Sequence, residues 1–253
     1  MNMIENFERE QQKIRELDFT GNSVDSDAMY RQYQRRNSFG LAPNKEIHRI
    51  FQRDYYEKDV ADGYLTLPLA TATVWADPLE NPLADIQDVD SVTGSQIHLG
   101  SLVSSFYALC WTNRATPQSS DWASFSHGKE AVRISTTVGK LMDRMMHTED
   151  SCYMHRSWLV NVEYRDPALI QAMKNPDEVY SRMESTGSLL VVSAALVRTQ
   201  FSDEDEVRLL FDASILQPLP GVNYLNNQSL VRIPFDWTGF VDNQVLISGP
   251  NRT

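Results

Sequence analysis

The sequence predicts a mixed fold of helices and strands built around one core. Two observations carry this prediction. Apolar residues near the N-terminus recur with a helical period, and from residue 47 onward short segments are apolar or alternate between apolar and polar residues. Apolar side chains recur every three or four residues along an amphipathic helix and every second residue along a strand, so the two patterns separate helices from strands. With 253 residues and 42% hydrophobic content, the chain is long enough to bury an ordinary core.

The N-terminal segment is predicted to form two helices outside that core. Residues 2–17 place apolar side chains in one thin stripe, and acidic and serine side chains at 25–27 can cap a second helix. Residues 38–44 are predicted to form a linker. We therefore expect residues 1–43 to be a separable helical extension of a core domain at 44–253. The stripe indicates either a hairpin that closes over the core, which we favour, or an arm that binds a partner.

The core is predicted to begin with a strand, a helix, a glycine and a second strand. Residues 47–51 have strand composition and place His48 and Arg49 on opposite faces. Residues 54–62 suit a short helix, and strand character resumes at 64–67. A charge in an apolar strand is tolerated only when it is paired or faces a ligand, so we expect Arg49 to line a pocket. His48 is explained either as a ligand-binding residue or, more simply, as a hydrogen-bonded core histidine.

The remaining elements alternate between apolar or alternating strands and short helices. The segment 106–112 is too short and too aromatic to favour a helix, and an aspartate followed by proline at 166–167 is a preferred helix start. The other predicted elements are a strand at 131–135, a helix at 137–146, a strand at 157–164, an apolar helix at 188–199, and strands at 230–235 and 241–248.

The overall charge argues against a nucleic-acid-binding surface. The formal net charge is −11 and the sequence pI is about 4.9, whereas non-specific affinity for nucleic acids comes from clustered Lys and Arg. The dense basic cluster near the N-terminus is Arg31, Arg35 and Arg36, so a local basic patch stays open. Nucleic acid is not expected as a partner.

Cysteine usage and hydropathy point to a cytoplasmic protein. Cys110 and Cys152 form no CxxC pair and have no histidine at metal-ligand spacing, so neither a disulfide scaffold nor a metal site is expected. The first residues lack the basic and apolar regions of a signal peptide. The longest apolar run, residues 189–197, is too short to span a bilayer, so no membrane association is expected.

Residues 199–212 join four consecutive acids to an apolar segment. We predict a strand in which Glu204, Glu206 and Arg208 share one face, because side chains in a strand alternate. Charged residues commonly protect an edge strand from unwanted pairing, and this is the simpler interpretation. The alternative is a pair of catalytic carboxylates.

Three motifs together resemble a bacterial domain family of unknown function. Its pattern is an Asp-Pro-Phe-Glu turn, a Trp-x-x-Tyr element and a Glu-x-Glu-x-Arg strand. The matching segments are Trp75-Ala76-Asp77-Pro78-Leu79-Glu80, then Cys110-Trp111-Thr112 followed by Asp121-Trp122-Ala123-Ser124-Phe125, then Glu204-Asp205-Glu206-Val207-Arg208. The resemblance covers residues 47–248, with Leu79 and Phe125 where the family has Phe and Tyr. From the residues alone, Asp77 and Glu80 are expected to cap a following helix rather than to act in catalysis.

A more distant resemblance is to mono-ADP-ribosyltransferases of the Arg, Ser-x-Ser, Glu-x-Glu type. The motifs His48-Arg49, Ser124-Phe125-Ser126 and Glu204-Asp205-Glu206 occur in that order. This resemblance implies an α+β fold with a mixed, mainly antiparallel split sheet, flanking helices and a nicotinamide cleft. It also implies NAD as the substrate, held by His48, Arg49, Ser124 and Ser126, with Glu206 as the catalytic carboxylate and Glu204 as its helper.

Two functional hypotheses follow from these resemblances. The first is an NAD-dependent mono-ADP-ribosyltransferase or NAD glycohydrolase that acts as the effector of a bacterial toxin or antiphage defence system, with a partner or inhibitor protein holding it inactive. The second is a non-catalytic interaction or sensor module of such a system that binds a partner protein. Stabilisation by NAD would separate them, because only the first requires a dinucleotide site.

Overall fold

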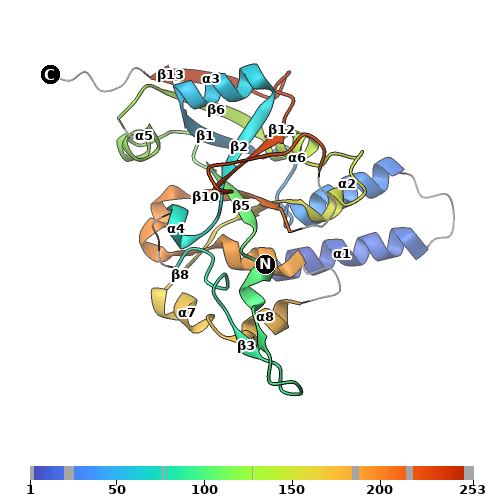
Figure 1. Ribbon diagram of the computed structural model, residues 1–253. Coiled ribbons are helices and arrows are strands. Elements are labelled where there is room, and N and C mark those ends of the chain that lie inside the picture. Colours follow the sequence, from blue (N-terminus) through green and yellow to red (C-terminus); the bar gives the residue numbers. More distant parts are fainter. Residues whose placement is uncertain are drawn as a thin grey trace.

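The computed structural model describes residues 3–19, 26–75, 77, 79–126, 128–183, 188–214 and 219–247. Within these ranges the centre of the fold is a six-stranded sheet with the order β13-β6-β1-β5-β10-β7 (Figure 1). Every neighbouring pair in it is antiparallel, so the fold is α+β with a mainly antiparallel sheet. The strands are β1 (Glu46–Gln52), β5 (Phe106–Thr112), β6 (Ala131–Thr137), β7 (Ser157–Asn161), β10 (Glu206–Asp212) and β13 (Asn243–Ile247).

The sheet opens between β1 and β5. The one position at which these two strands pair in the described chain is His48 with Thr112. By contrast, β1 pairs with β6 along its whole length, and so does β5 with β10. Beyond the junction the carbonyl oxygen of Cys110 accepts a hydrogen bond from Arg49 Nη1, so a side chain replaces the missing ladder partner. Arg49 is therefore placed at the opening.

Apolar residues cover both faces of the sheet. On β10, Leu209 and Phe211 face one buried cluster, and Leu210 faces the other. Because side chains in a strand have a period of two, Glu206 and Arg208 lie on the Leu210 face. On this face of β10, the polar side chains end at Arg208 and the apolar ones begin at Leu210.

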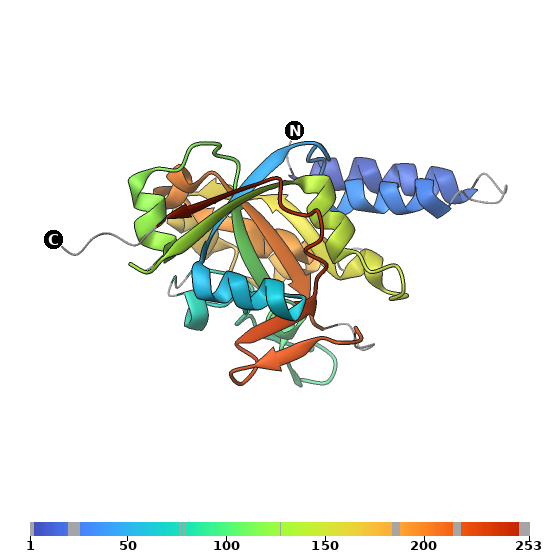
Figure 2. The ribbon, with the colours of Figure 1, turned by 90° about the horizontal axis from the view of Figure 1, so that it is seen from above.

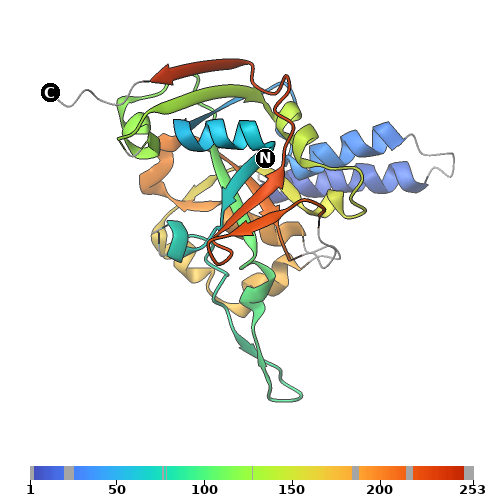
Figure 3. The same ribbon diagram turned by 45° about the horizontal axis from the view of Figure 1, so that its top comes forward.

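A second sheet and several short elements surround this centre. Among the described residues the second sheet has the order β11-β12-β2, and the β3-β4 hairpin extends away from the body in Figure 3. These strands are β2 (Tyr64–Pro68), β3 (Asp88–Val89), β4 (Gln96–Ile97), β11 (Asn223–Leu225) and β12 (Leu230–Pro234). A parallel pair, β8 (Glu163–Arg165) and β9 (Leu196–Arg198), lies apart from both sheets.

Three of the short helices in the described chain begin at a side chain that caps them. Thr137 accepts a hydrogen bond from the Lys140 amide at the start of α6, and Asp166 does the same for Ala168 at the start of α7. At the end of α3, Gly63 has a φ of 71°, a left-handed conformation that suits glycine. The helices beyond the first two are α3 (Arg53–Asp62), α4 (Ala72–Trp75), α5 (Ser119–Ser126), α6 (Val138–Met145), α7 (Pro167–Ala172) and α8 (Pro176–Arg182). No helix in the described part of the chain is both long and apolar enough to cross a membrane.

The helices α1 (Met3–Phe19) and α2 (Ser26–Asn37) form a hairpin that projects from one side of the body, as Figure 2 shows. Its base belongs to the core. Phe7 and Phe39 are 2% and 4% exposed, and the ring centroid of each lies 6.3 Å from that of Trp158. The Arg36 guanidinium lies 5.3 Å from the Trp158 ring centroid, and Asn37 Nδ2 donates to the carbonyl oxygens of Met154 and Ser157. Phe7 and Phe39 therefore share a core with Trp158 of β7, and the separability of residues 1–43 stays a prediction that truncation tests.

Two predicted elements differ from the structure near the acidic segment. The apolar helix expected at 188–199 is a 3₁₀ helix at Ser188–Ala195 followed by β9. The strand expected from residue 199 is a 3₁₀ helix at Thr199–Glu204, and β10 begins two residues later. The first difference comes from tertiary packing, since every residue of Ser188–Ala195 is buried.

Candidate active site

Glu204 and Glu206 come from different elements but line the same cavity. Between them, Asp205 has a φ of 44°, in the left-handed region that Asp tolerates better than most residues. Two bonds from β5 and the loop after it hold this turn: Thr112 Oγ1 donates to the Glu204 carbonyl at 2.7 Å, and the Asn113 amide donates to the Asp205 carbonyl at 2.9 Å. The prediction that Glu204 shares a strand face with Glu206 is therefore wrong, although the two carboxylates still meet.

The cavity lies where β1 and β5 separate. Its volume is about 20 Å³, room for about one water molecule. Residues from β1, β5, β6, α5, the loop before α5 and the start of β10 surround it. They are His48, Arg49, Ile50, Cys110, Trp111, Thr112, Arg114, Pro117, Asp121, Phe125, Arg133, Glu204 and Glu206.

The Glu206 carboxylate is 4% exposed and paired with Arg208. Arg208 Nε donates to Oε1 at 2.7 Å and Nη2 donates to Oε2 at 3.1 Å. The backbone amide of Glu206 donates to the Tyr164 hydroxyl at 2.8 Å, which fixes the start of β10. This bidentate arrangement sets the orientation of the carboxylate beside the cavity.

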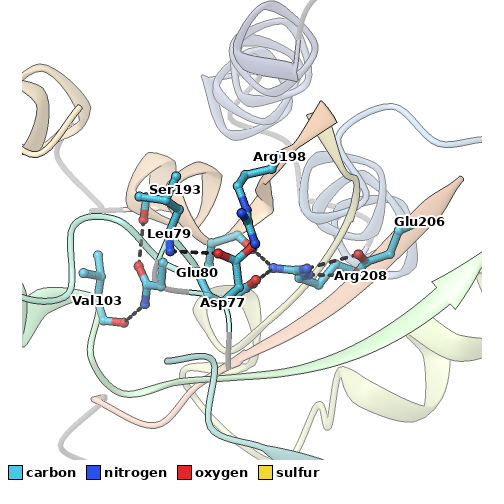
Figure 4. A network of polar contacts seen from close by, with 10 residues as sticks. Asp77, Leu79, Glu80, Val103, Ser193, Arg198, Glu206 and Arg208 are labelled. Carbon is cyan, nitrogen blue, oxygen red and sulfur yellow. Dashed lines mark hydrogen bonds and ion pairs between the residues drawn. The ribbon is translucent and has the colours of Figure 1, made fainter. Parts of the chain in front are cut away.

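Arg208 joins Glu206 to the turn around residues 77–81, which Figure 4 shows from close by. Its Nη1 donates to Glu80 Oε1 and, at 2.6 Å, to the Ala194 carbonyl. Its guanidinium carbon lies 4.4 Å from the ring centroid of Trp75. One buried cation thus contacts two carboxylates, a carbonyl and an aromatic face, so the first and third motifs of the family resemblance meet here.

Asp77 and Glu80 do not cap a helix. Asp77 Oδ1 accepts from the Leu79 amide at 2.9 Å and closes a turn, while Oδ2 accepts from Arg198 Nε at 3.1 Å (Figure 4). Burial raises the pKa of Glu80, and the Arg208 guanidinium opposes this rise. Both acids therefore hold the turn against β9 and β10.

Two residues of β1, Arg49 and His48, also line the cavity. Arg49 packs over Phe51, with 4.7 Å between its guanidinium carbon and the ring centroid. Burial lowers the pKa of Arg49 to about 10, so its guanidinium stays charged at neutral pH. Burial and the nearby Arg133 lower the pKa of His48, which keeps its imidazole neutral at pH 7.

Several buried nitrogen atoms around the cavity have no hydrogen-bond partner among the described residues. They are His48 Nδ1, Arg49 Nε, Trp111 Nε1, Arg114 Nε and Arg114 Nη1. Buried polar atoms in native proteins are normally paired, and an unpaired group calls for a bound water, ion or ligand. The lining of the cavity therefore combines arginines that carry unpaired donors with the carboxylates of Glu204 and Glu206.

Burial and neighbouring charges raise the pKa of Glu204 and of the Cys110 thiol in this site. Burial, followed by the repulsion of Glu206, raises the pKa of Glu204 to about 7, and Arg208 partly offsets the rise. Burial also raises the pKa of the Cys110 thiol, again with Glu206 contributing, so the thiol is neutral and weakly nucleophilic. Glu204 is thus the acid of the pair that can exchange a proton near neutral pH.

The predicted serine motif is only partly placed. Ser126 is buried and its Oγ accepts a hydrogen bond from the Gly128 amide at 3.2 Å, which ends α5. It does not line the cavity, whereas Phe125 does. The side chain of Ser124 lies outside the described residues. The structure therefore places His48, Arg49, Glu204 and Glu206 around one cavity, and Ser126 lies outside its lining.

The sequence patterns do not point to Arg114 and Asp121 in this site, because the two residues flank a loop without a periodic pattern. Arg133, in contrast, is with Arg208 the sequence-based alternative to Arg49 as an anion clamp, and it lines the cavity. A basic residue two positions after a predicted central strand, followed by an acid at a helix start, was the signal available. No group of three or more His, Cys, Asp or Glu side chains in the described ranges is arranged to hold a metal ion.

Comparison of this chain with protein-family models, with curated proteins and with solved structures finds no match. The fold and the site thus define an α+β domain with a small cavity at an opening in its sheet, and several charged residues line that cavity. The residues of this cavity carry the functional argument.

Proposed function

We propose that this protein cleaves NAD, as a mono-ADP-ribosyltransferase or an NAD glycohydrolase, and serves as the effector of a bacterial toxin or antiphage defence system. The observation that carries the proposal is the cavity in which Glu204 and Glu206 face guanidinium donors without partners. The single pairing of β1 with β5 among the described residues supports a split sheet of the kind that the transferase resemblance implies.

The chemistry requires a carboxylate beside a ribose and cations beside a diphosphate. The bond between nicotinamide N1 and ribose C1′ breaks, and its electron pair leaves with neutral nicotinamide. The ribosyl group then carries an oxocarbenium charge, which Glu206 stabilises. Water or an acceptor nucleophile attacks C1′ and releases a proton. Glu204 accepts this proton when the nucleophile is an acceptor, because its pKa of about 7 suits a general base near neutral pH. The proton released by water passes to the solvent.

Arg49 is the proposed clamp for the diphosphate. Its Nε is buried without a described partner, while Nη1 is engaged with the Cys110 carbonyl. A guanidinium binds phosphate oxygens through charge-assisted hydrogen bonds. His48 and Arg49 belong to one half of the opened sheet and Glu206 to the other, so a bound dinucleotide would contact both halves.

Ligand entry requires the cavity to enlarge. A dinucleotide needs a site of roughly 300–1,000 Å³, and the cavity has a volume of about 20 Å³. Pro117, Asp121 and Phe125 close it from the loop before α5 and from α5 itself. Displacement of α5 is therefore part of the proposal.

The proposal is tested with purified protein, NAD and two readouts. Nicotinamide release reports cleavage, and thermal shift reports binding, since a ligand at one hundred times its Kd stabilises by about 2.7 kcal/mol. We expect release by the wild type and a smaller thermal shift for Arg49→Ala. Glu57→Gln, on the exposed face of α3, is the matched control for carboxylate variants. Absence of both release and shift at millimolar NAD would refute the proposal.

The closed state of the cavity favours a second candidate, a non-catalytic interaction or sensor module. In that case the charged residues only stabilise the fold, and the projecting α1-α2 hairpin binds a partner protein (Figure 2). The acidic net charge of −11 suits a basic protein partner better than nucleic acid. A folded protein without NAD-dependent stabilisation would favour this candidate.

A further inference from the structure

Arg133 of β6 makes hydrogen bonds to the loop between β5 and α5. Arg133 Nη2 donates to the carbonyl oxygens of Arg114 and Ala115, at 2.9 and 2.7 Å. These two bonds fix the backbone at the position from which the Arg114 side chain reaches the cavity. A residue on a rigid strand therefore determines where the Arg114 guanidinium lies.

The Arg114 guanidinium is largely buried and only weakly paired. Its Nη2 donates to Asp121 Oδ1 at 3.3 Å, longer than the 2.7–2.9 Å of a typical charge-assisted bond. Nε and Nη1 have no partner within the described chain. The side chains of Arg114 and Asp121 are 19% and 11% exposed, so water satisfies these donors only in part.

Asp121 is fixed independently of this pair. Its Oδ2 accepts a hydrogen bond from the Gln118 amide at 2.8 Å, which caps the start of α5. The Arg114–Asp121 contact therefore joins the loop to α5, the helix that closes the cavity. Loss of this contact would leave the cap on α5 intact.

We propose that Arg114 binds the diphosphate group of the ligand, and that Asp121 holds its guanidinium until the ligand replaces that carboxylate. Two features of the geometry support this: the unpaired Arg114 donors, and the Arg49 Nε on the same cavity, also without a described partner. A diphosphate carries more charge and more acceptor oxygens than one carboxylate, so it satisfies donors that Asp121 leaves unpaired. The exchange releases α5 from the loop. The identity of the ligand as a dinucleotide rests on the proposed function, whereas the diphosphate site does not.

The test is titration of the full-length protein with inorganic pyrophosphate, followed by thermal shift and calorimetry. Arg114→Gln removes the charge, and we expect it to weaken pyrophosphate binding at least tenfold. Asp121→Asn removes the competing charge but keeps an oxygen for the Gln118 amide, and we expect binding to tighten several-fold. Arg53→Gln, an exposed arginine on α3, is the matched control and should bind like the wild type.

Two results would overturn the inference. One is pyrophosphate binding by a folded Arg114→Gln protein that equals wild-type binding. The other is Asp121→Asn binding no tighter than the wild type, which decides the matter even if Arg114→Gln fails to fold. Nicotinamide release, measured in the same samples, separates this inference from the proposed function. Arg114-dependent pyrophosphate binding without release supports the site and refutes NAD cleavage, whereas release with Arg114-independent binding does the reverse.

Discussion

Arg208 donates hydrogen bonds to both carboxylate oxygens of Glu206, which lies two residues before it on β10. The same guanidinium also donates to Glu80. All three side chains are buried. The ion pairs therefore cannot be replaced by water if one partner is lost, and the remaining charges would stay in a medium of low dielectric constant.

Replacement of Arg208 by methionine is the sharpest test of this network. It leaves Glu206 and Glu80 without their cation, and we expect the free energy of unfolding to fall by about 3–5 kcal/mol. Chemical denaturation measures the loss. Arg53→Met, which removes two exposed ion pairs, with Glu57 and Glu130, is the control and should change stability little. A loss no larger than that of the control would show that the network does not stabilise the fold.

Glu204 should make stability depend on pH. Its pKa rises from 4.5 to about 7 on folding, so between these values the folded state binds more protons at this carboxyl than the unfolded state. Its contribution to the free energy of unfolding therefore falls as pH rises through this window, by at most about 1.4 kcal/mol per pH unit. Solvent access to the half-buried side chain reduces this limit.

The measurement compares wild type with Glu204→Gln across that window. The variant cannot titrate at this position, so its stability relative to the wild type should increase from pH 4.5 to pH 7. Buried acids that do not interact with Glu204 contribute equally to both proteins and cancel in the difference. A difference that stays constant with pH would contradict the raised pKa.

The two carboxylates should have separable effects on NAD chemistry. Glu206→Gln should lose both hydrolysis and transfer, by a factor of about 10²–10³ if electrostatic stabilisation dominates. Glu204→Gln should spare hydrolysis and reduce transfer, because Glu204 orients and deprotonates the acceptor, whereas the proton released by water passes to the solvent. Nicotinamide release and label transfer are measured together, with the melting temperature as a check on folding. Equal release from the wild type and a well-folded Glu206→Gln protein would remove Glu206 from catalysis.

A chain that begins at Pro43 should be strongly destabilised. Truncation removes Phe7 and Phe39, and burial of each aromatic ring contributes about 1.5–3 kcal/mol. It also exposes Trp158 and takes Asn37 away from the carbonyls of Met154 and Ser157. Thermal unfolding and dye binding to exposed apolar surface test this. If the truncated protein unfolds cooperatively at the melting temperature of the full-length protein, residues 1–43 are a separable extension.

Local sequence patterns predicted the elements that local chemistry determines. The strands at β1 and β5, the cap at Asp166 and the glycine after α3 follow from side-chain period, capping and left-handed geometry. The same patterns put Arg49 beside a pocket, where the structure places it. These features depend on residues within one or two helical turns of each other.

Local sequence patterns could not predict the features that depend on residues far apart in the chain. The turn at Asp205 depends on bonds from Thr112 and Asn113, which lie some ninety residues earlier in the chain. Arg114 and Asp121 gain their importance from the opening between β1 and β5, and no local pattern encodes where two paired strands separate. Glu80 likewise is an ordinary turn residue until β10 brings Arg208 to it.

The junction of His48 with Thr112 also bears on how the molecule can move. Within the described chain this is the one ladder position that joins the β13-β6-β1 half of the sheet to the β5-β10-β7 half. A small rotation about it would change the distance between Arg49 and Glu206 without breaking the ladders inside either half. The junction therefore has the geometry of a hinge. A molecule bound to both halves of the sheet would fix the angle between them.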